Sequence, residues 1–195
     1  RYIEQVLPSL GEAGVQQVVL ADLVPGHRVG RIEDDDTKRV KGDIRMSKFI
    51  AGAVRDRERP LRDDLVIPFG AEYLRLRVSE SSRIIRDARR RYRRHNAAAR
   101  WVETEVVEAM AATSKREEID LEALRESLRD IPEFRAAIIR MWPVLSPGEV
   151  LHDLFGSRAL VRSAAQDVLK EHEWPLLVRE RSESLTEVHW AESDV

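Results

Sequence analysis

Helical periodicity in the second half of the chain is the feature that most constrains its fold. From Arg83 onward, apolar residues recur every three or four positions, which places them on one face of an α-helix. Proline, glycine or polar residues that suit helix ends separate these stretches. The pattern predicts helices at about 80–93, 96–112, 120–129, 132–141, 147–154 and 158–172. We therefore expect a mainly α fold with a bundle-like set of helices.

The preceding residues predict one more helix and a small sheet. Apolar residues at helical spacing indicate a helix at about 37–57, and the acidic run at 33–36 lies where the helix dipole favours negative charge. A calcium loop is the alternative for that run, but it lacks the ligand spacing and central glycine of an EF-hand. Two strand-like runs at 64–68 and 72–78 flank Phe69-Gly70 and predict a β-hairpin. Ser79 to Ser82 suit the N-cap of the helix that follows.

The two ends of the chain differ in pattern from its middle. Residues 2–10 have helical spacing, and residues 15–20 form a short β-branched run typical of a buried strand. Residues 186–190 alternate like an edge strand. The chain begins without methionine and stops without a terminating signal. We therefore expect an internal piece of a longer protein.

Composition limits the partners and the compartment. The 33 Lys and Arg residues nearly balance 35 Asp and Glu, so the net charge of -2 gives no global attraction to nucleic acid. The absence of cysteine excludes disulfides and thiolate metal sites and favours a reducing, cytoplasmic compartment. No apolar run approaches the roughly 20 residues that span a bilayer, so no membrane partner is expected.

The sequence contains no recognisable catalytic motif. It lacks a phosphate-binding P-loop, and no serine stands in a nucleophile elbow. None of the five histidines pairs with another at the spacing of a metal-binding helix. The prediction is a chain without catalytic residues, cofactor or metal of its own.

Two clusters are candidate binding surfaces. The first consists of Arg86, Arg90, Arg93 and Arg94. These arginines fall on one face of the predicted helix and suit a polyanion or an acidic partner. The alternative is a solvated face that pairs with Glu103, Glu105 and Glu108. The second cluster consists of Trp142, Leu145, Leu154 and Phe155. It is interpreted as core, with a partner-docking wedge as the alternative.

Six stretches of the sequence, taken in order, resemble a known protein family. They are RYIEQVLPSLGE at 1–12, VKGDIRMSKFIAGAVRDRERP at 40–60, VIPFG at 66–70, RRHNAAAR at 93–100, MWPVLSPGEVLHDLFGSRALVRSAA at 141–165 and VHWAESDV at 188–195. In this order they resemble the HelD family of bacterial helicase-like ATPases, relatives of UvrD and Rep that act on RNA polymerase.

The resemblance implies that this chain lies between the Walker A and Walker B motifs of such an ATPase. Residues 1–25 would be a remnant of the first RecA-like motor domain, 26–185 a family-specific, mainly helical insertion domain, and 186–195 the return towards the motor domain. The parent protein, and not this chain, would bind ATP and Mg²⁺.

The resemblance also implies a partner. The insertion would contact the rest of its own motor domains and dock on RNA polymerase near the clamp, where it helps to open the clamp and release nucleic acid. The alternative is a nucleic-acid-binding accessory domain of a UvrD/Rep-type DNA helicase.

Overall fold

The computed structural model describes residues 29–116, 118–181, 183 and 190–191. The helix and strand expected at 2–10 and 15–20, and most of the edge strand expected at 186–190, lie outside these residues. The described part contains eight α-helices, two short 3-10 helices and four short strands. The prediction of a mainly α fold with a small antiparallel sheet is confirmed. None of the described helices is long and apolar enough to cross a membrane.

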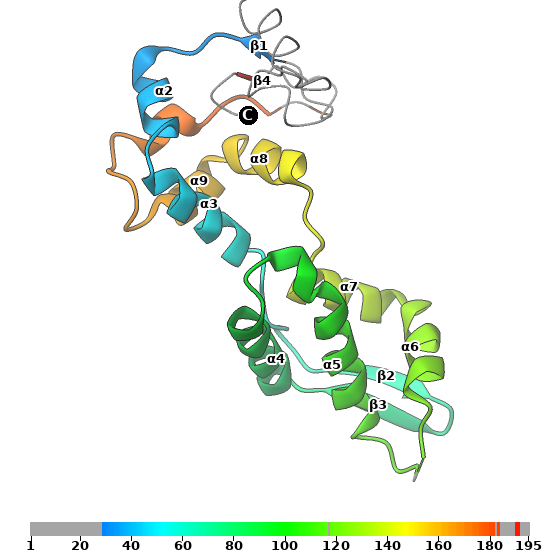
Figure 1. Ribbon diagram of the computed structural model, residues 1–195. Coiled ribbons are helices and arrows are strands. Elements are labelled where there is room, and N and C mark those ends of the chain that lie inside the picture. Colours follow the sequence, from blue (N-terminus) through cyan, green and yellow to red (C-terminus); the bar gives the residue numbers. More distant parts are fainter. Residues whose placement is uncertain (1–28, 117, 182, 184–189, 192–195) are drawn as a thin grey trace, which may run out of the picture.

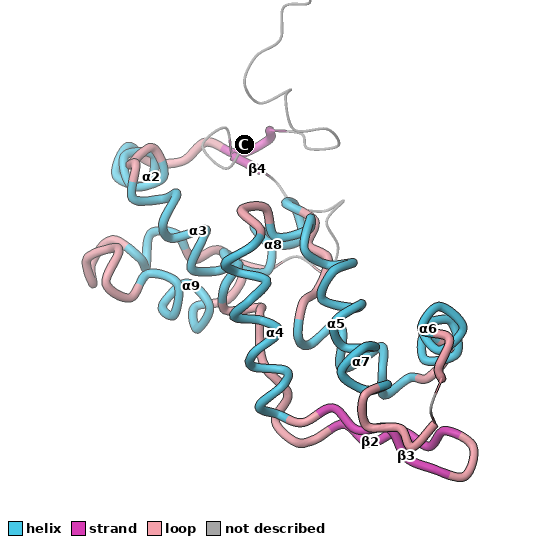
Figure 2. The backbone as a smooth tube through the Cα atoms, turned by 60° about the horizontal axis from the view of Figure 1, so that its bottom comes forward, coloured by secondary structure: helices cyan, strands magenta, loops and turns pink. Residues whose placement is uncertain are grey.

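The described residues form two lobes, each around its own hydrophobic core (Figures 1 and 2). The proximal lobe consists of β1 (Val29–Arg31), α2 (Asp35–Lys41), α3 (Arg45–Arg55), α8 (Pro147–Phe155), α9 (Arg158–Ala165), η3 (Trp174–Leu177) and β4 (Trp190–Ala191). The distal lobe consists of β2 (Leu65–Phe69), β3 (Glu72–Leu76), α4 (Val78–Arg91), η2 (His95–Ala98), α5 (Ala99–Ala111), α6 (Leu121–Arg129) and α7 (Pro132–Met141). The distal lobe is therefore inserted between α3 and α8.

The proximal lobe contains a capped helix, α2, followed by a helix break that the sequence pattern did not predict. Asp34 caps α2 because its carboxylate accepts hydrogen bonds from the backbone N–H and the hydroxyl of Thr37 at 2.8 and 2.9 Å. The helix expected at 37–57 is instead two helices, since α2 ends at a C-cap formed by Gly42. Asp43 then accepts the backbone N–H of Arg45 at 2.8 Å, which satisfies a donor at the start of α3.

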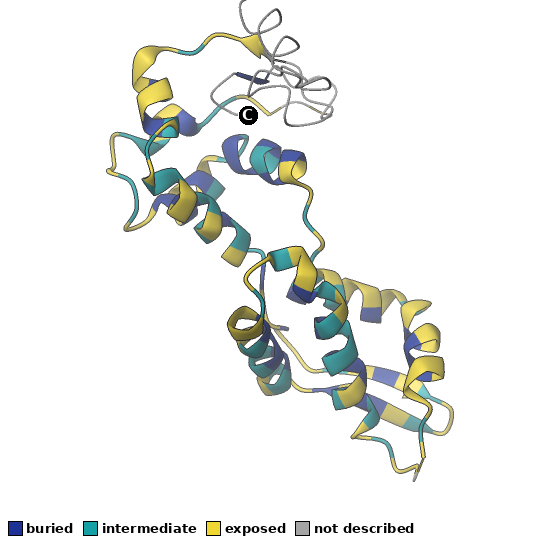
Figure 3. Cartoon of the chain, viewed as in Figure 1, coloured by how far each residue is buried: buried dark blue, intermediate teal, exposed yellow. Residues whose placement is uncertain are grey.

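Helices α3, α8 and α9 enclose the proximal core. Phe49 on α3 is fully buried and stacks on Phe155 at the end of α8, with ring centroids 6.4 Å apart. Helix α9 is shorter than the expected 158–172, because the chain turns away at Asp167, whose φ of 61° is incompatible with a continuing helix. The buried side of each helix faces the interior of its own lobe (Figure 3).

An ion pair ties the start of α3 to the segment before η3. The Arg45 guanidinium donates two hydrogen bonds to Glu173, each 2.9 Å long, and the backbone N–H of Lys170 donates a third at 2.7 Å. Such a bidentate arrangement fixes both side chains and is among the stronger types of charged pair. The pair therefore connects two segments that lie 128 residues apart in the sequence.

Acidification is expected to weaken the proximal lobe through Glu173. Its hydrogen bonds from Arg45 and Lys170 lower the pKa of Glu173 to about 2, from an ordinary value of 4.5. A carboxyl group with a lowered folded-state pKa stabilises the fold above its unfolded pKa and loses that contribution as the pH falls towards the folded value. We therefore expect Glu173→Gln to lower the unfolding free energy at neutral pH, and the deficit to shrink between pH 4.5 and about 2.

Urea denaturation at a series of pH values measures this deficit. Glu171→Gln is the matched control, because Glu171 is exposed and has no ion pair among the described residues. A deficit that stayed constant down to pH 2 would mean that the charge of Glu173 contributes nothing.

A β-hairpin and helices α4 to α7 build the distal lobe. Strands β2 and β3 pair antiparallel from Leu65↔Leu76 to Phe69↔Glu72, which confirms the predicted hairpin. Gly70 occupies the turn with a φ of 64°, a conformation that glycine adopts without steric cost. The inner face of the hairpin buries Ile67 and Leu74 against the helices, while Tyr73 on the outer face is 68% exposed.

Helix α4 starts earlier than the serine cluster suggested. Arg77 is its N-cap residue, and the carboxylate of Asp64 accepts the backbone N–H of Val78 at 2.9 Å. Ser81 lies inside the first turn, where its hydroxyl donates to the Val78 carbonyl at 2.7 Å and accepts the Leu61 N–H at 3.1 Å. The expectation that Ser79 to Ser82 supply the cap is wrong, because a distant aspartate takes this role.

The ends of the described chain meet in a parallel strand pair. Val29 pairs with Trp190, and Arg31 pairs with Ala191. Trp190 and Ala191 are 3% and 1% exposed. The two strands therefore lie side by side at one end of the molecule, with the distal lobe at the other end (Figure 1).

Candidate functional site at the junction between the lobes

Two chain crossings join the lobes, and hydrogen bonds connect them. We call this region the junction; it comprises residues 55–60, 89–96 and 142–146. The backbone N–H of Arg59 donates to the Arg140 carbonyl at 3.3 Å, and the Arg140 guanidinium donates to the Pro60 carbonyl at 3.0 Å. The side chain of Asn96 forms two hydrogen bonds with the backbone of Leu145, at 2.8 and 2.9 Å. Asn96 therefore joins the distal lobe to the second crossing.

A buried carboxylate lies at the centre of the junction. Glu58 is 7% exposed and contacts two groups of the distal lobe, the Arg89 guanidinium and the Nδ1 atom of His95. Arg89 also donates to the carbonyls of Arg55 and Glu58, at 3.2 and 3.3 Å. These contacts close the gap between the end of α3 and the end of α4.

Electrostatics keep Glu58 ionised. Burial by itself would raise the pKa of Glu58, but the hydrogen bonds from His95 and Arg89 outweigh burial and lower this pKa below its ordinary value. The Nδ1 atom of His95 lies 2.9 Å from the carboxylate, and its Nε2 atom lies 2.7 Å from the Pro143 carbonyl. Both neighbours are hydrogen-bond acceptors, so either ring nitrogen can donate to the group that it faces.

Trp142 holds the histidine in place. The two rings stack almost in parallel, with centroids 4.7 Å apart, and the indole N–H donates to the His95 carbonyl at 2.9 Å. Trp142 is itself 3% exposed. The histidine is therefore fixed by contacts on its face and at both ring nitrogens.

An arginine-rich cleft opens beside this carboxylate, between α3 and α4. Its volume is about 640 Å³. The lining residues are Ala51, Val54, Arg55, Glu58, Arg89, Arg90, Tyr92, Arg93, His95 and Trp142. Glu58 pairs with Arg89, and Asp87 pairs with Arg90. Arg55 and Arg93 have no ion-pair partner among the described residues, so the cleft carries uncompensated positive charge.

The predicted arginine face is only partly present. Helix α4 ends at Arg91, and the backbone is extended at Tyr92 and Arg94, so Arg93 and Arg94 do not share a helical face with Arg86 and Arg90. The chain leaves the helix where the ring of Tyr92 packs on Trp101, with centroids 6.0 Å apart. Arg90 and Arg93 nevertheless both line the cleft, whereas Arg86 and Arg94 are exposed outside it.

The acidic partners proposed for that face are mostly engaged elsewhere. Glu103 accepts two hydrogen bonds from Arg129, at 2.6 and 2.9 Å. Glu105 lies 3.9 Å from Arg83, which is not one of the four candidate arginines. The carboxylates that do neutralise arginines beside the cleft are Asp87 and Glu58.

The apolar candidates do not form one cluster. Trp142 belongs to the distal core, while Leu154 and Phe155 belong to the proximal core. Leu145 is half-buried in the crossing between the lobes. Trp142, Leu154 and Phe155 are at most 3% exposed, so they pack inside the lobes and present no wedge to a partner.

Sequence reasoning missed Arg55, Glu58, Arg89 and His95 as members of this site. Glu58 lies 31 residues from Arg89 and 37 from His95 in the sequence. No local spacing rule connects residues so far apart. A charged segment before Pro60, followed by a histidine next to an arginine run, was the only available signal.

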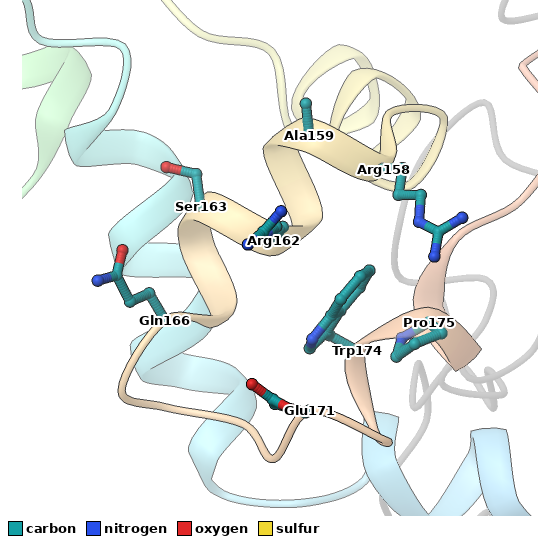
Figure 4. Close-up of a pocket in the computed structure, with 8 residues that line it drawn as sticks. All are labelled: Arg158, Ala159, Arg162, Ser163, Gln166, Glu171, Trp174 and Pro175. Carbon is teal, nitrogen blue, oxygen red and sulfur yellow. The ribbon is translucent and has the colours of Figure 1, made fainter.

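A second hollow lies on the proximal lobe, beside α9. It has a volume of about 1030 Å³ and is drawn in Figure 4. Trp174 forms one wall, with the Arg158 guanidinium 5.5 Å from its ring centroid. Arg162 and Glu171 contribute charges of opposite sign. Within the described ranges, no three His, Cys, Asp or Glu side chains are grouped to hold a metal ion.

The fold and the cleft together define a mainly α protein of two lobes with a basic cleft at their junction. The sequence matches no protein-family model, and no curated protein shows significant similarity to it.

Proposed function

We propose that this chain is a non-catalytic module inserted in a HelD-like helicase-type ATPase, and that it docks on RNA polymerase. The observation that carries the proposal is the parallel pairing of β1 with β4. Parallel strands require a crossover connection, and here the chain between β1 and β4 forms the rest of the proximal lobe and the whole distal lobe. A module inserted between two neighbouring strands of a parallel sheet, such as that of a RecA-like motor domain, would have this topology.

The distal lobe is the part proposed to reach the partner. It lies away from the strand pair and exposes apolar side chains, among them Tyr73 at 68% and Ile139 at 64%. Exposed aromatic and aliphatic side chains are common anchors of protein interfaces. Docking near the polymerase clamp would allow the module to act as a lever that helps to open the clamp and release nucleic acid. ATP and Mg²⁺ would be bound by the motor domains of the parent protein in the cytoplasm.

Removal of the distal lobe tests this proposal. The two crossings approach each other at Arg59 and Arg140, where the N–H and carbonyl groups lie 3.3 Å apart, so a short glycine linker can replace residues 61–139. We expect the deletion in the full parent protein to lower polymerase binding in a pull-down with purified polymerase while ATP hydrolysis continues. Unchanged binding would contradict the proposal.

Point variants provide a matched comparison. Tyr73→Ser and Ile139→Ser change exposed apolar side chains of the distal lobe, and Ile44→Ser changes one of the proximal lobe that is 86% exposed. We expect only the distal variants to weaken polymerase binding.

The arginines favour a second candidate, a nucleic-acid-binding accessory domain of a UvrD/Rep-type helicase. Four arginines line the junction cleft, and Arg86 and Arg94 are exposed nearby. Binding through phosphate contacts would weaken steeply with salt. Reversal of Arg86 and Arg94 to Glu should then reduce DNA binding and leave polymerase binding intact.

A further inference from the structure

The junction cleft concentrates positive charge that the described residues do not fully neutralise. Arg55 enters from α3, while Arg90 and Arg93 enter from the distal lobe. Arg55 and Arg93 lack ion-pair partners among the described residues, and both are exposed. Guanidinium groups that converge in a cleft repel each other, and an anion between them relieves that repulsion.

The surroundings of Arg89 are already organised. Glu58 and two backbone carbonyls hold its guanidinium in place, and the stacked His95 and Trp142 rings hold Glu58 through His95. The Arg89 guanidinium is already fixed by the protein. It therefore loses little conformational entropy when an anion binds beside it. Arg89 is therefore positioned by the protein itself, whereas Arg55 and Arg93 have no ion-pair partner among the described residues and can turn towards an anion.

The aromatic residues of the cleft indicate which anion it fits. Trp142 is buried and stacked on His95, and Tyr92 packs on Trp101. Trp142 is therefore not available to stack on a nucleobase, and Tyr92 is only half-exposed, whereas single-stranded nucleic-acid sites normally present open aromatic faces to successive bases. The volume of about 640 Å³ lies in the range of small-molecule sites. Charge, rather than base shape, is the feature that a ligand here would match.

We infer that the junction cleft binds the phosphate groups of a compact polyphosphate, and that the bound anion bridges the two lobes. The anion would contact Arg55 from the proximal lobe and Arg93 from the distal lobe. Because the contacts come from both lobes, an anion bound in the cleft would favour one orientation of the lobes. The inference does not depend on the identity of the docking partner.

Isothermal titration calorimetry of the chain with inorganic pyrophosphate tests the inference. We expect saturable binding that Arg55→Gln and Arg93→Gln each weaken about tenfold, the loss expected for one charged hydrogen bond. Arg86→Gln, on helix α4 outside the cleft, and Arg158→Gln, in the hollow beside α9, are matched controls that should change affinity less than about twofold. Circular dichroism verifies that each variant is folded.

Three results would overturn the inference. They are the absence of pyrophosphate binding, an equal loss in Arg86→Gln, and tighter binding of an oligothymidylate through Arg55 and Arg93 than of pyrophosphate. The last would assign the cleft to a nucleic-acid backbone. Sodium sulfate is the competitor control, added at the same concentration as pyrophosphate and at matched ionic strength. Sulfate should not displace pyrophosphate from the cleft, and equal competition would indicate an adventitious ion only.

A distance measurement between the lobes tests whether the bound anion bridges them. The sequence contains no cysteine, so Lys48→Cys and Ser127→Cys introduce one exposed spin label in each lobe. We expect pyrophosphate to narrow the distance distribution between the labels, and Arg55→Gln to prevent this. A distribution that pyrophosphate leaves unchanged in the wild-type background would refute bridging.

Discussion

Phe155→Ala is expected to destabilise the proximal lobe by about 3–5 kcal/mol, the range for loss of a buried phenylalanine ring. Phe155 is 2% exposed and stacks on Phe49, with centroids 6.4 Å apart. Lys41 and Arg179 lie over its ring at 5.2 and 5.4 Å, so truncation also removes two cation–π contacts. The cavity would lie where α3 and α8 meet.

Hydrogen exchange resolved by peptide is the appropriate measurement, because the two cores are separate. Peptides from α3, α8 and α9 should lose protection, while those from α5 and the hairpin should keep it. Phe134→Ala, which opens a cavity in the distal core, should produce the opposite pattern. Equal loss of protection in both lobes would show that they unfold as one cooperative unit.

Glu58→Ala is expected to lower the unfolding free energy by about 2–3 kcal/mol, because it leaves His95 and Arg89 without their anionic partner at the junction. Arg89 keeps its contacts to two carbonyls and partial access to water, which reduces the loss below that of a fully buried pair. The variant should also broaden the distribution of lobe orientations, since Glu58 connects the end of α3 to groups of the distal lobe.

Urea denaturation of Glu58→Ala and of Glu103→Ala provides the test. Glu103 also pairs with an arginine, Arg129, but that pair is half-exposed and lies within the distal lobe. Its loss should cost no more than about 1 kcal/mol. Because the pKa of Glu58 is lowered in the folded state, its contribution is present at neutral pH and is lost as the pH falls through that lowered value. Equal effects of the two substitutions at neutral pH would contradict a special role for the junction.

Local signals were sufficient for much of the fold. The helices expected at 120–129 and 132–141 occur at Leu121–Arg129 and Pro132–Met141, because Asp120 caps the first and Pro132 begins the second. The hairpin was predictable because a glycine turn separates two strand-like runs. In each case, the residues that decide the structure are neighbours in the sequence.

Local signals failed where a helix end depends on distant contacts. Helix α4 was expected to continue to residue 93, but Tyr92 leaves it to pack on Trp101, and His95 turns towards Glu58. This early end placed Arg93 in the junction cleft and Arg94 outside it. The arginine run correctly indicated the region of the cleft. No spacing rule could predict that Arg55 and Glu58, at and just beyond the end of α3, would join it.

The sequence by itself determined that this protein is mainly helical, with one hairpin and a concentration of arginine after residue 83. These properties follow from periodicity and composition, which act over a few residues. Only the tertiary structure decided that the helices divide into two lobes, that Trp142 and Phe155 belong to different cores, and that Arg55, Arg89, Arg90 and Arg93 converge beside Glu58. The physical reason is that burial and ion pairing depend on distance in space, and Glu58 lies 31 and 37 positions in the chain from Arg89 and His95, the two residues that it contacts.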